Sequence, residues 1–241
     1  HAMGDKLREI IDDESMDHMG FEEKIKLMLD AETIARSDRK VERLIRQARF
    51  EYKDASIEGI QYPPERKLSR DRVDRLTACR WVRDRETLII ISGTGSDKSY
   101  ISQALGNAAF RNGIPNRYVR PQDMLEQIDR ARLESQSECY RQVDQFKSVE
   151  LLILDDFLTT SATAADSVLI FEIMEARNGT GATLIASQCE PGQWYVRTGS
   201  ELIADGTLSR ITGADRYLEL EGPDMRRKPD NDTRPDILKK E

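Results

Sequence analysis

The stretch that decides the fold is Leu88-Ile89-Ile90-Ile91-Ser92-Gly93-Thr94-Gly95-Ser96-Asp97-Lys98-Ser99. Its first half is an apolar run typical of a strand that is buried on both faces of a parallel sheet. Its second half is a Gly/Ser-rich loop that opens a helix expected over 98–111. A loop between a buried strand and a helix is the context of a phosphate-binding P-loop, in which backbone N–H groups and the helix N-terminus surround phosphates.

The loop matches the P-loop pattern G-x-x-x-x-G-K-[ST] only in part. Lys98 would neutralise the β- and γ-phosphates of a nucleotide, and the hydroxyl of Ser99 would ligate Mg²⁺. Gly95 supplies flexibility, but Ser92 and Asp97 replace the two glycines of the pattern. An ordinary strand-to-helix turn therefore stays open as the alternative for the loop taken alone.

Asp97 fits the pattern least. Glycine is favoured at this position because the backbone must approach the phosphates closely. A carboxylate there is expected to repel the phosphates, or to pair with Lys98 in the empty site. We therefore expect weak ATP binding.

Short apolar strands alternate with helices on both sides of this loop. Strands are expected at 87–91, 117–119, 151–154, 182–187 and 216–220, and helices at 71–84, 98–111, 122–146, 163–177 and 199–210. This alternation predicts an α/β fold with a parallel sheet covered by helices on both faces.

Two acids, Asp155 and Asp156, follow the buried run at 151–154. The carboxyl end of a strand is where open α/β sheets bind ligands. One acid there can hold Mg²⁺, and its neighbour can polarise a water for attack on the γ-phosphate. A helix N-cap or a strand-ending turn is the alternative, but a position roughly 55 residues after the loop lysine, on a separate strand, favours the site.

Two further polar residues are candidates for the same site. Gln188 ends the strand at 182–187, where its amide could bind the attacking water or the γ-phosphate; it could equally be a polar strand terminus. Arg210 could reach the γ-phosphate of a neighbouring subunit, since arginine makes planar, always-charged phosphate contacts. A solvated arginine at a helix end is the alternative for Arg210.

The N-terminal part is expected to be helical over residues 20–50, with an apolar stripe at 3.6-residue spacing. Another face carries a basic stripe, Arg36, Arg39, Lys40, Arg43, Arg46 and Arg49. In a chain with a net charge of −7, this concentration favours a surface for a DNA backbone. A solvated helix face is the alternative. A second basic group comprises Arg117, Arg120, Arg130 and Arg132.

The prolines in Tyr62-Pro63-Pro64 exclude helix and indicate an extended linker. The expected organisation is a helical N-terminal domain over 1–62, a linker over 63–70, an ATPase domain over 71–222 and a polar tail over 223–241. His1-Ala2-Met3 is interpreted as a cloning scar.

The amino-acid composition excludes several classes of protein. No run of ~18 apolar residues is present, which excludes a membrane-spanning helix. Three separated cysteines form no disulfide framework, and two histidines give no histidine-based zinc site. A cytoplasmic protein is therefore expected.

The order of a P-loop, an apolar strand with Asp155-Asp156, a Ser187-Gln188 strand end and a late arginine resembles AAA+ ATPases. In particular the chain is similar to IstB-like proteins, the ATP-dependent transposition helpers of bacterial insertion sequences, which are related to DnaC-type helicase loaders. The resemblance covers nearly the whole chain. Its most specific marks are Glu42-Arg43-Leu44-Ile45-Arg46-Gln47-Ala48-Arg49 and Ser99-Tyr100-Ile101-Ser102-Gln103-Ala104-Leu105-Gly106.

The resemblance implies an ATPase that uses ATP and Mg²⁺, forms a multimer on duplex DNA, and recruits and activates a transposase. It also implies that the region of Arg117 and Arg120 lines a DNA channel. Carried over by position, the nucleotide-binding residues are Gly93, Thr94, Gly95, Ser96, Asp97, Lys98, Ser99 and Tyr100, with Arg226 as a second sensor. The implied Mg²⁺ contacts are Ser99 and Asp155, the water-activating acid is Asp156, the first sensor is Gln188 and the trans-acting arginine is Arg210.

The sequence departs from the family at Ser92, Asp97, Ser209 and Asp224, and the first two bear on catalytic competence. Two rival functions stay open. A helicase loader would share the ATPase core but recruit a helicase and prefer single strands. A nucleotide-binding DNA scaffold would have lost hydrolysis because of Asp97.

Overall fold

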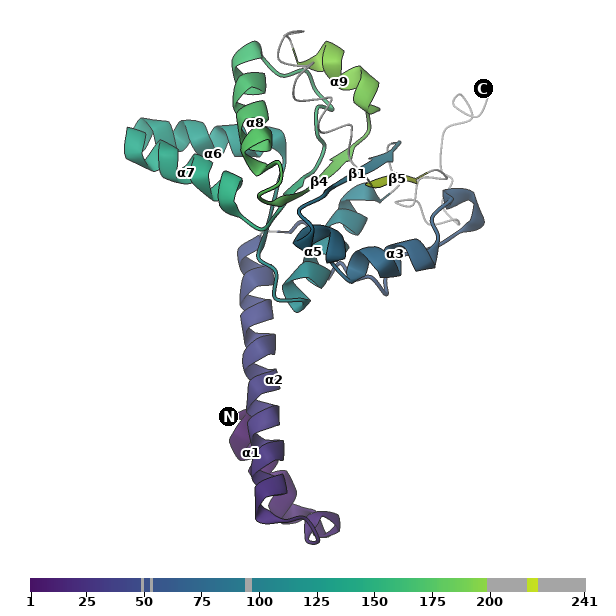
Figure 1. Cartoon of the computed structure of the whole chain (residues 1–241), viewed down its shortest axis with the longest axis vertical. Helices are drawn as coiled ribbons and strands as arrows, with labels where there is room; N and C mark the ends of the chain where they lie inside the picture. The colour runs from purple at the N-terminus through teal and green to yellow at the C-terminus, as the bar shows by residue number, and fades with distance from the viewer. Residues whose placement is uncertain (49, 53, 94–96, 199–215, 221–241) are drawn as a thin grey trace, which may run out of the picture. The chain divides into compact units, whose positions relative to one another are not determined.

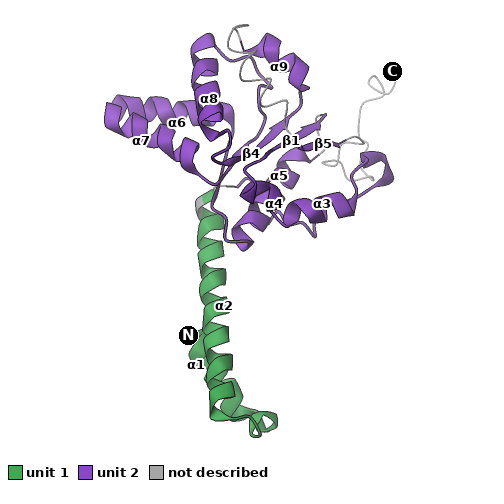
Figure 2. Ribbon diagram, in the orientation of Figure 1, with its two compact units in different colours: residues 1–49 green, residues 50–241 purple. Residues whose placement is uncertain are grey.

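The computed structural model describes all residues except 49, 53, 94–96, 199–215 and 221–241. Contacts divide the chain into two compact units, residues 1–49 and 50–241 (Figure 2). No helix among the described residues is long and apolar enough to cross a membrane.

The first unit is helical. It comprises α1 (Ala2–Asp12), a short 3₁₀ turn η1 (Glu14–Met16) and α2 (Phe21–Ala48). Asp13 stabilises the turn between the helices, because its carboxylate accepts a hydrogen bond from the backbone N–H of Ser15 at 2.9 Å. The buried side chains Ile10 and Met28 supply apolar surface to α1 and α2. The helix expected over 20–50 is thus present as α2.

The second unit is built on a parallel five-stranded sheet. Its strands are β1 (Thr87–Ser92), β2 (Asn116–Val119), β3 (Leu151–Leu154), β4 (Ala182–Ser187) and β5 (Arg216–Leu220), in the order β2-β3-β4-β1-β5. All four pairs of neighbouring strands in the described part of the chain are parallel. The expected α/β fold and all five expected strands are confirmed.

Helices cover both faces of the sheet (Figure 1). They are α3 (Arg70–Thr77), α4 (Arg80–Arg83), α5 (Lys98–Arg111), α6 (Pro121–Glu134), α7 (Gln136–Ser148), α8 (Ala164–Arg177) and α9 (Pro191–Arg197). Side chains alternate along β1, so Leu88 and Ile90 join a core with α3 and α5, whereas Ile89 joins a core with α6, α7 and α8.

Two expected helices are each divided in the structure. The helix expected at 71–84 becomes α3 and α4, because Cys79 between them has a left-handed backbone with φ 54°. The helix expected at 122–146 becomes α6 and α7, because Ser135 is extended and accepts a hydrogen bond from the N–H of Glu138, which caps α7. The helix expected at 199–210 lies outside the described residues.

The boundary between the units precedes Phe50 rather than following residue 62. Ala55 and Ile60 lie in the same core as β1 and α5, so residues 50–62 belong to the second unit by packing. The segment expected to be an extended linker includes a 3₁₀ turn, η2 (Pro64–Arg66), and the side chain of Arg66 is buried.

Candidate nucleotide-binding site

The carboxyl ends of β1, β3 and β4 bring together the polar residues selected from the sequence. Lys98 is the first residue of α5, which follows β1. Asp155 and Asp156 follow β3, and Gln188 follows β4. Because β3, β4 and β1 are parallel neighbours, their ends meet at one edge of the sheet.

Lys98 and Asp156 form an ion pair at this edge. The Lys98 Nζ lies 3.0 Å from Asp156 Oδ1, and the two side chains are 5% and 31% exposed. Burial by itself would raise the pKa of the Asp156 carboxyl, but the hydrogen bond and charge of Lys98, followed by Gln188 and Arg120, outweigh burial and lower it. Asp156 is therefore a carboxylate base at neutral pH.

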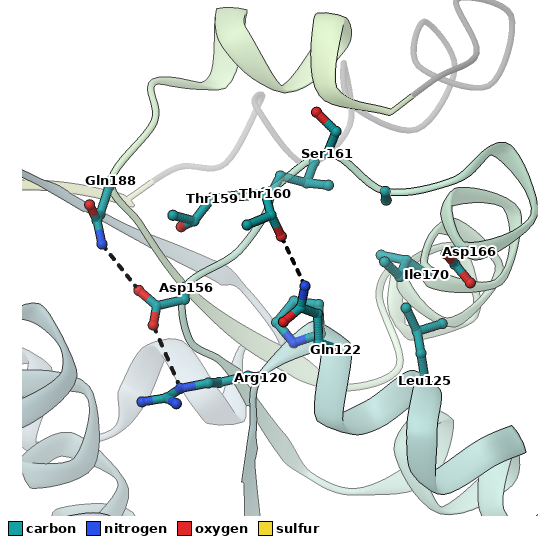
Figure 3. Close-up of a pocket in the computed structure, with 13 residues that line it drawn as sticks. Arg120, Gln122, Leu125, Asp156, Thr159, Thr160, Ser161, Asp166, Ile170 and Gln188 are labelled. Carbon is teal, nitrogen blue, oxygen red and sulfur yellow. Dashed lines mark hydrogen bonds and ion pairs between the residues drawn. The ribbon is translucent and has the colours of Figure 1, made fainter. Parts of the chain in front are cut away.

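Two further side chains contact the Asp156 carboxylate (Figure 3). Arg120 Nε lies 3.6 Å from Oδ2, and Gln188 Nε2 donates to Oδ1 at 3.5 Å. Arg120 also donates to Glu51 Oε2 at 2.9 Å. Asp156 itself has a left-handed backbone with φ 53°. Such strained conformations cluster at functional sites.

Asp155 is fully buried and is held from two sides. Tyr118 OH on β2 donates to its Oδ2 at 2.7 Å, and the backbone N–H of Asp156 donates to its Oδ1 at 2.9 Å. Burial and the charge of Asp155 raise the pKa of the Tyr118 phenol, so Tyr118 remains a donor. The sequence analysis did not select Tyr118 as a site residue. The feature that could have pointed to it is the position of this tyrosine in the short strand expected at 117–119.

The P-loop residues are described in part. Ser99 is buried in the first turn of α5. Tyr100 OH accepts from the N–H of Ser56 at 3.3 Å, and its ring meets Tyr52 at 5.8 Å, so these contacts tie it to the segment before η2. Gly93 is described, but Thr94, Gly95 and Ser96 lie outside the described residues, as do Arg49, Arg210 and Arg226.

Asp97 pairs with a residue that sequence reasoning did not select. Its Oδ2 lies 3.9 Å from an Nη atom of the buried Arg66, whereas Lys98 pairs with Asp156. The expected pairing of Asp97 with Lys98 is therefore replaced by two separate ion pairs.

The basic residues fall into different environments. Lys40, Arg43 and Arg46 are exposed on α2, whereas Arg36 and Arg39 both pair with Glu32. Arg117 lies over the ring of Phe146 and donates to two glutamines, so it is engaged in packing between α6 and α7. On α6, Arg130 and Arg132 pair with acids of the same helix.

A cavity of about 270 Å³ opens beside Asp156 (Figure 3). Polar side chains from the segment after β3 and from α6 face it, and Gln122 donates to Thr160 at 3.1 Å across it. The apolar side chains Leu125 and Ile170 line its far wall. The cavity gives the Asp156 carboxylate access to a space large enough for several waters.

The residues at this edge suit a nucleotide with Mg²⁺. Lys98 provides a buried ammonium at the start of a helix, which is the position for phosphate. Ser99 and Asp155 offer the oxygen donors that Mg²⁺ prefers. The donor set therefore fits the group that the sequence implies.

A family model described as "IstB-like ATP binding protein" matches residues 1–233. An insertion-sequence ATP-binding protein of Sinorhizobium fredii is 29% identical over 94% of this chain and 90% of its own length. An insertion-sequence ATP-binding protein of Pseudomonas fluorescens is 31% identical over 70% of this chain and 73% of its own length.

Solved structures share the fold. The replication initiator DnaA, bound to AMPPCP and single-stranded DNA, superposes with a TM-score of 0.59 at 20% identity, over 70% of this chain and 50% of that chain. The DnaC helicase loader superposes with a TM-score of 0.57 at 16% identity, over 70% of this chain and 98% of that chain. The fold is therefore that of P-loop AAA+ proteins.

Proposed function

This chain belongs to the IstB-like ATP-binding proteins, and from that premise we propose that it is an ATPase that assembles on duplex DNA and recruits and activates a transposase. The observation that carries the proposal is the convergence of Lys98, Asp155, Asp156 and Gln188 at one edge of the sheet. These are the groups that phosphoryl transfer to water requires: a cation for phosphate, an acid for Mg²⁺, a base and a polar sensor.

Each residue has a distinct proposed role. Lys98 binds the β- and γ-phosphates, with backbone N–H groups of residues 93–99. Ser99 and Asp155 hold Mg²⁺, which neutralises charge on the phosphates when bound. Asp156 orients and deprotonates the attacking water, and Gln188 senses the γ-phosphate.

Lys98 pairs with Asp156 at this edge of the sheet. Phosphate oxygens would compete for the Lys98 ammonium, which would free the Asp156 carboxylate for water. Arg120 stays available to orient that carboxylate through its 3.6 Å contact. Arg210 of a neighbouring subunit and Arg226 of the same chain complete the proposed site.

DNA binding is assigned to the basic stripe on α2. Lys40, Arg43 and Arg46 are exposed there, and exposed cations can neutralise DNA phosphates. Arg117 is removed from the proposed DNA contacts because its guanidinium is engaged by Phe146 and by glutamine side chains.

The name "insertion-sequence ATP-binding protein" carried by the relatives favours a transposase over a helicase as the partner. Binding to duplex and single-stranded DNA of one sequence, each with and without ATP, tests the choice. We expect ATP to favour assemblies on the duplex, and capture of the transposase encoded by the same insertion sequence. A preference for single strands together with capture of the replicative helicase would support the loader instead.

A further inference from the structure

The backbone of Asp97 adopts the conformation that glycine usually provides. Its φ is 57° and its ψ is 24°, in the left-handed region, and its carbonyl accepts from the N–H of Ile101 at 2.9 Å to open α5. Aspartate is among the residues that visit this region most readily. Asp97 therefore adopts, at the start of α5, a left-handed backbone conformation that glycine reaches most easily.

The Asp97 side chain makes a contact that glycine could not make. Its Oδ2 lies 3.9 Å from Arg66 Nη2, and the two side chains are 27% and 2% exposed. Arg66 belongs to η2 and donates through Nη1 to the carbonyl of Gln61 at 2.9 Å. Burial lowers the pKa of the Arg66 guanidinium and the charge of Asp97 opposes that effect, but arginine remains charged at physiological pH. A fixed positive charge thus lies against the acid.

We propose that Arg66 is a positioning residue for nucleotide binding, which holds the Asp97 carboxylate away from the phosphate position and so makes an acid tolerable in the P-loop. The inference rests on the proposed ATP site. It replaces the expectation that Asp97 simply repels ATP. Arg66 acts through Asp97 and need not touch the nucleotide.

A double-mutant cycle separates this positioning role from a direct contact of Arg66 with phosphate and from a purely structural role of Arg66. The proteins are the full-length wild type, Arg66→Gln, Asp97→Asn and the double variant, each titrated with a fluorescent ATP analogue and Mg²⁺ at fixed salt. In the wild-type background Arg66→Gln should weaken binding about tenfold or more, because the released carboxylate turns toward the phosphates. In the Asp97→Asn background the same change should weaken binding less than about threefold, since no carboxylate remains to be released.

Equal losses in the two backgrounds would overturn the proposal, because a direct phosphate contact or a purely structural role predicts no coupling between Arg66 and Asp97. Arg66→Lys, which keeps the charge, should recover most of the affinity lost in Arg66→Gln. Thermal unfolding without nucleotide checks that each variant is folded.

Asp97→Asn alone provides a test that does not depend on the folding of the Arg66 variants. We expect its affinity to lie within about threefold of the wild type, because the carboxylate is already held away. A gain of tenfold or more would show that the acid repels phosphate in the wild type and would overturn the proposal. Absence of any binding by the wild type would instead contradict the proposed ATP site.

Discussion

Replacing Lys98 by methionine removes the ammonium that pairs with Asp156 but keeps a long apolar side chain. A hydrogen bond to a charged group contributes ~1.5–3 kcal/mol to stability. Asp156 is 31% exposed and keeps its contacts with Arg120 and Gln188, so solvent screening reduces the loss. We expect the nucleotide-free variant to lose ~1 kcal/mol, or ~2–4 °C in Tm for a unit of this size.

The loss should depend on pH with a defined sign. Because the folded state lowers the pKa of Asp156, this carboxylate contributes stability above its unfolded pKa of about 3.9. That contribution is lost as the pH falls through the lower, folded value. The difference in Tm between wild type and Lys98→Met should therefore be full at neutral pH, should begin to shrink only below about pH 4, and should disappear as the pH falls through the lower pKa of the folded state.

The second unit carries its own reporters for this experiment. Trp81 and Trp194 are the chain's two tryptophans and both are buried there, so their fluorescence follows unfolding of that unit. Lys147→Met is the matched control, because Lys147 pairs with the exposed Glu172 on α8. The control should change Tm by less than about 1 °C.

Lys98→Met should reduce the affinity for nucleotide far more than it reduces the free energy of unfolding. Lys98→Met should weaken binding of a fluorescent ATP analogue by about 100-fold or more, since ~3 kcal/mol of charged contacts corresponds to two decades. The control should bind like the wild type. Unchanged binding by Lys98→Met, or a stability loss that persists undiminished in acid, would refute the assignment of Lys98 and of its pair with Asp156.

Four other changes test the site and its surroundings. Asp156→Asn should bind the ATP analogue but should release no phosphate from ATP. If this variant hydrolysed ATP at the wild-type rate, another residue would have to be the general base. Tyr118→Phe removes the hydrogen bond that Tyr118 donates to the buried Asp155 carboxylate, and it should destabilise the protein by ~1–3 kcal/mol, measured as a lower Tm. An unchanged Tm would show that this hydrogen bond does not contribute to stability. Gly106→Ala would place a Cβ 2.8 Å from Phe50 Cζ, so overpacking should cost ~1–3 kcal/mol; a neutral result would contradict the packing of Phe50 in the second unit. The fourth change is charge reversal of three arginines in the basic stripe, Arg39, Arg43 and Arg46. It should weaken binding to every duplex and reduce the dependence of DNA affinity on salt concentration. An unaltered salt dependence would indicate that the basic stripe is a solvated helix face that does not bind DNA.

The sequence predicted the parts of the site that depend on the ends of parallel strands. Lys98, Asp156 and Gln188 each follow a recognisable strand, and the strands of such a sheet present their carboxyl ends at one edge. Their convergence could therefore be expected without knowing the strand order.

The remaining parts depend on contacts that no local pattern encodes. Tyr118 reaches Asp155 because β2 lies beside β3, and this adjacency depends on the order of the sheet. Arg66 reaches Asp97 because η2 folds back onto the start of α5. Residues 50–62 carry no strong periodicity, so their apolar side chains could not be assigned to the core of the second unit.

The central claim, that this edge of the sheet hydrolyses ATP under the control of duplex DNA, is tested most directly by steady-state phosphate release. The full chain is assayed with ATP and Mg²⁺, with and without duplex DNA, beside Asp156→Asn. We predict that the wild type releases phosphate, faster with DNA, and that the variant releases none in either condition. Release that is absent from the wild type with DNA, or equal in wild type and variant, would contradict the claim.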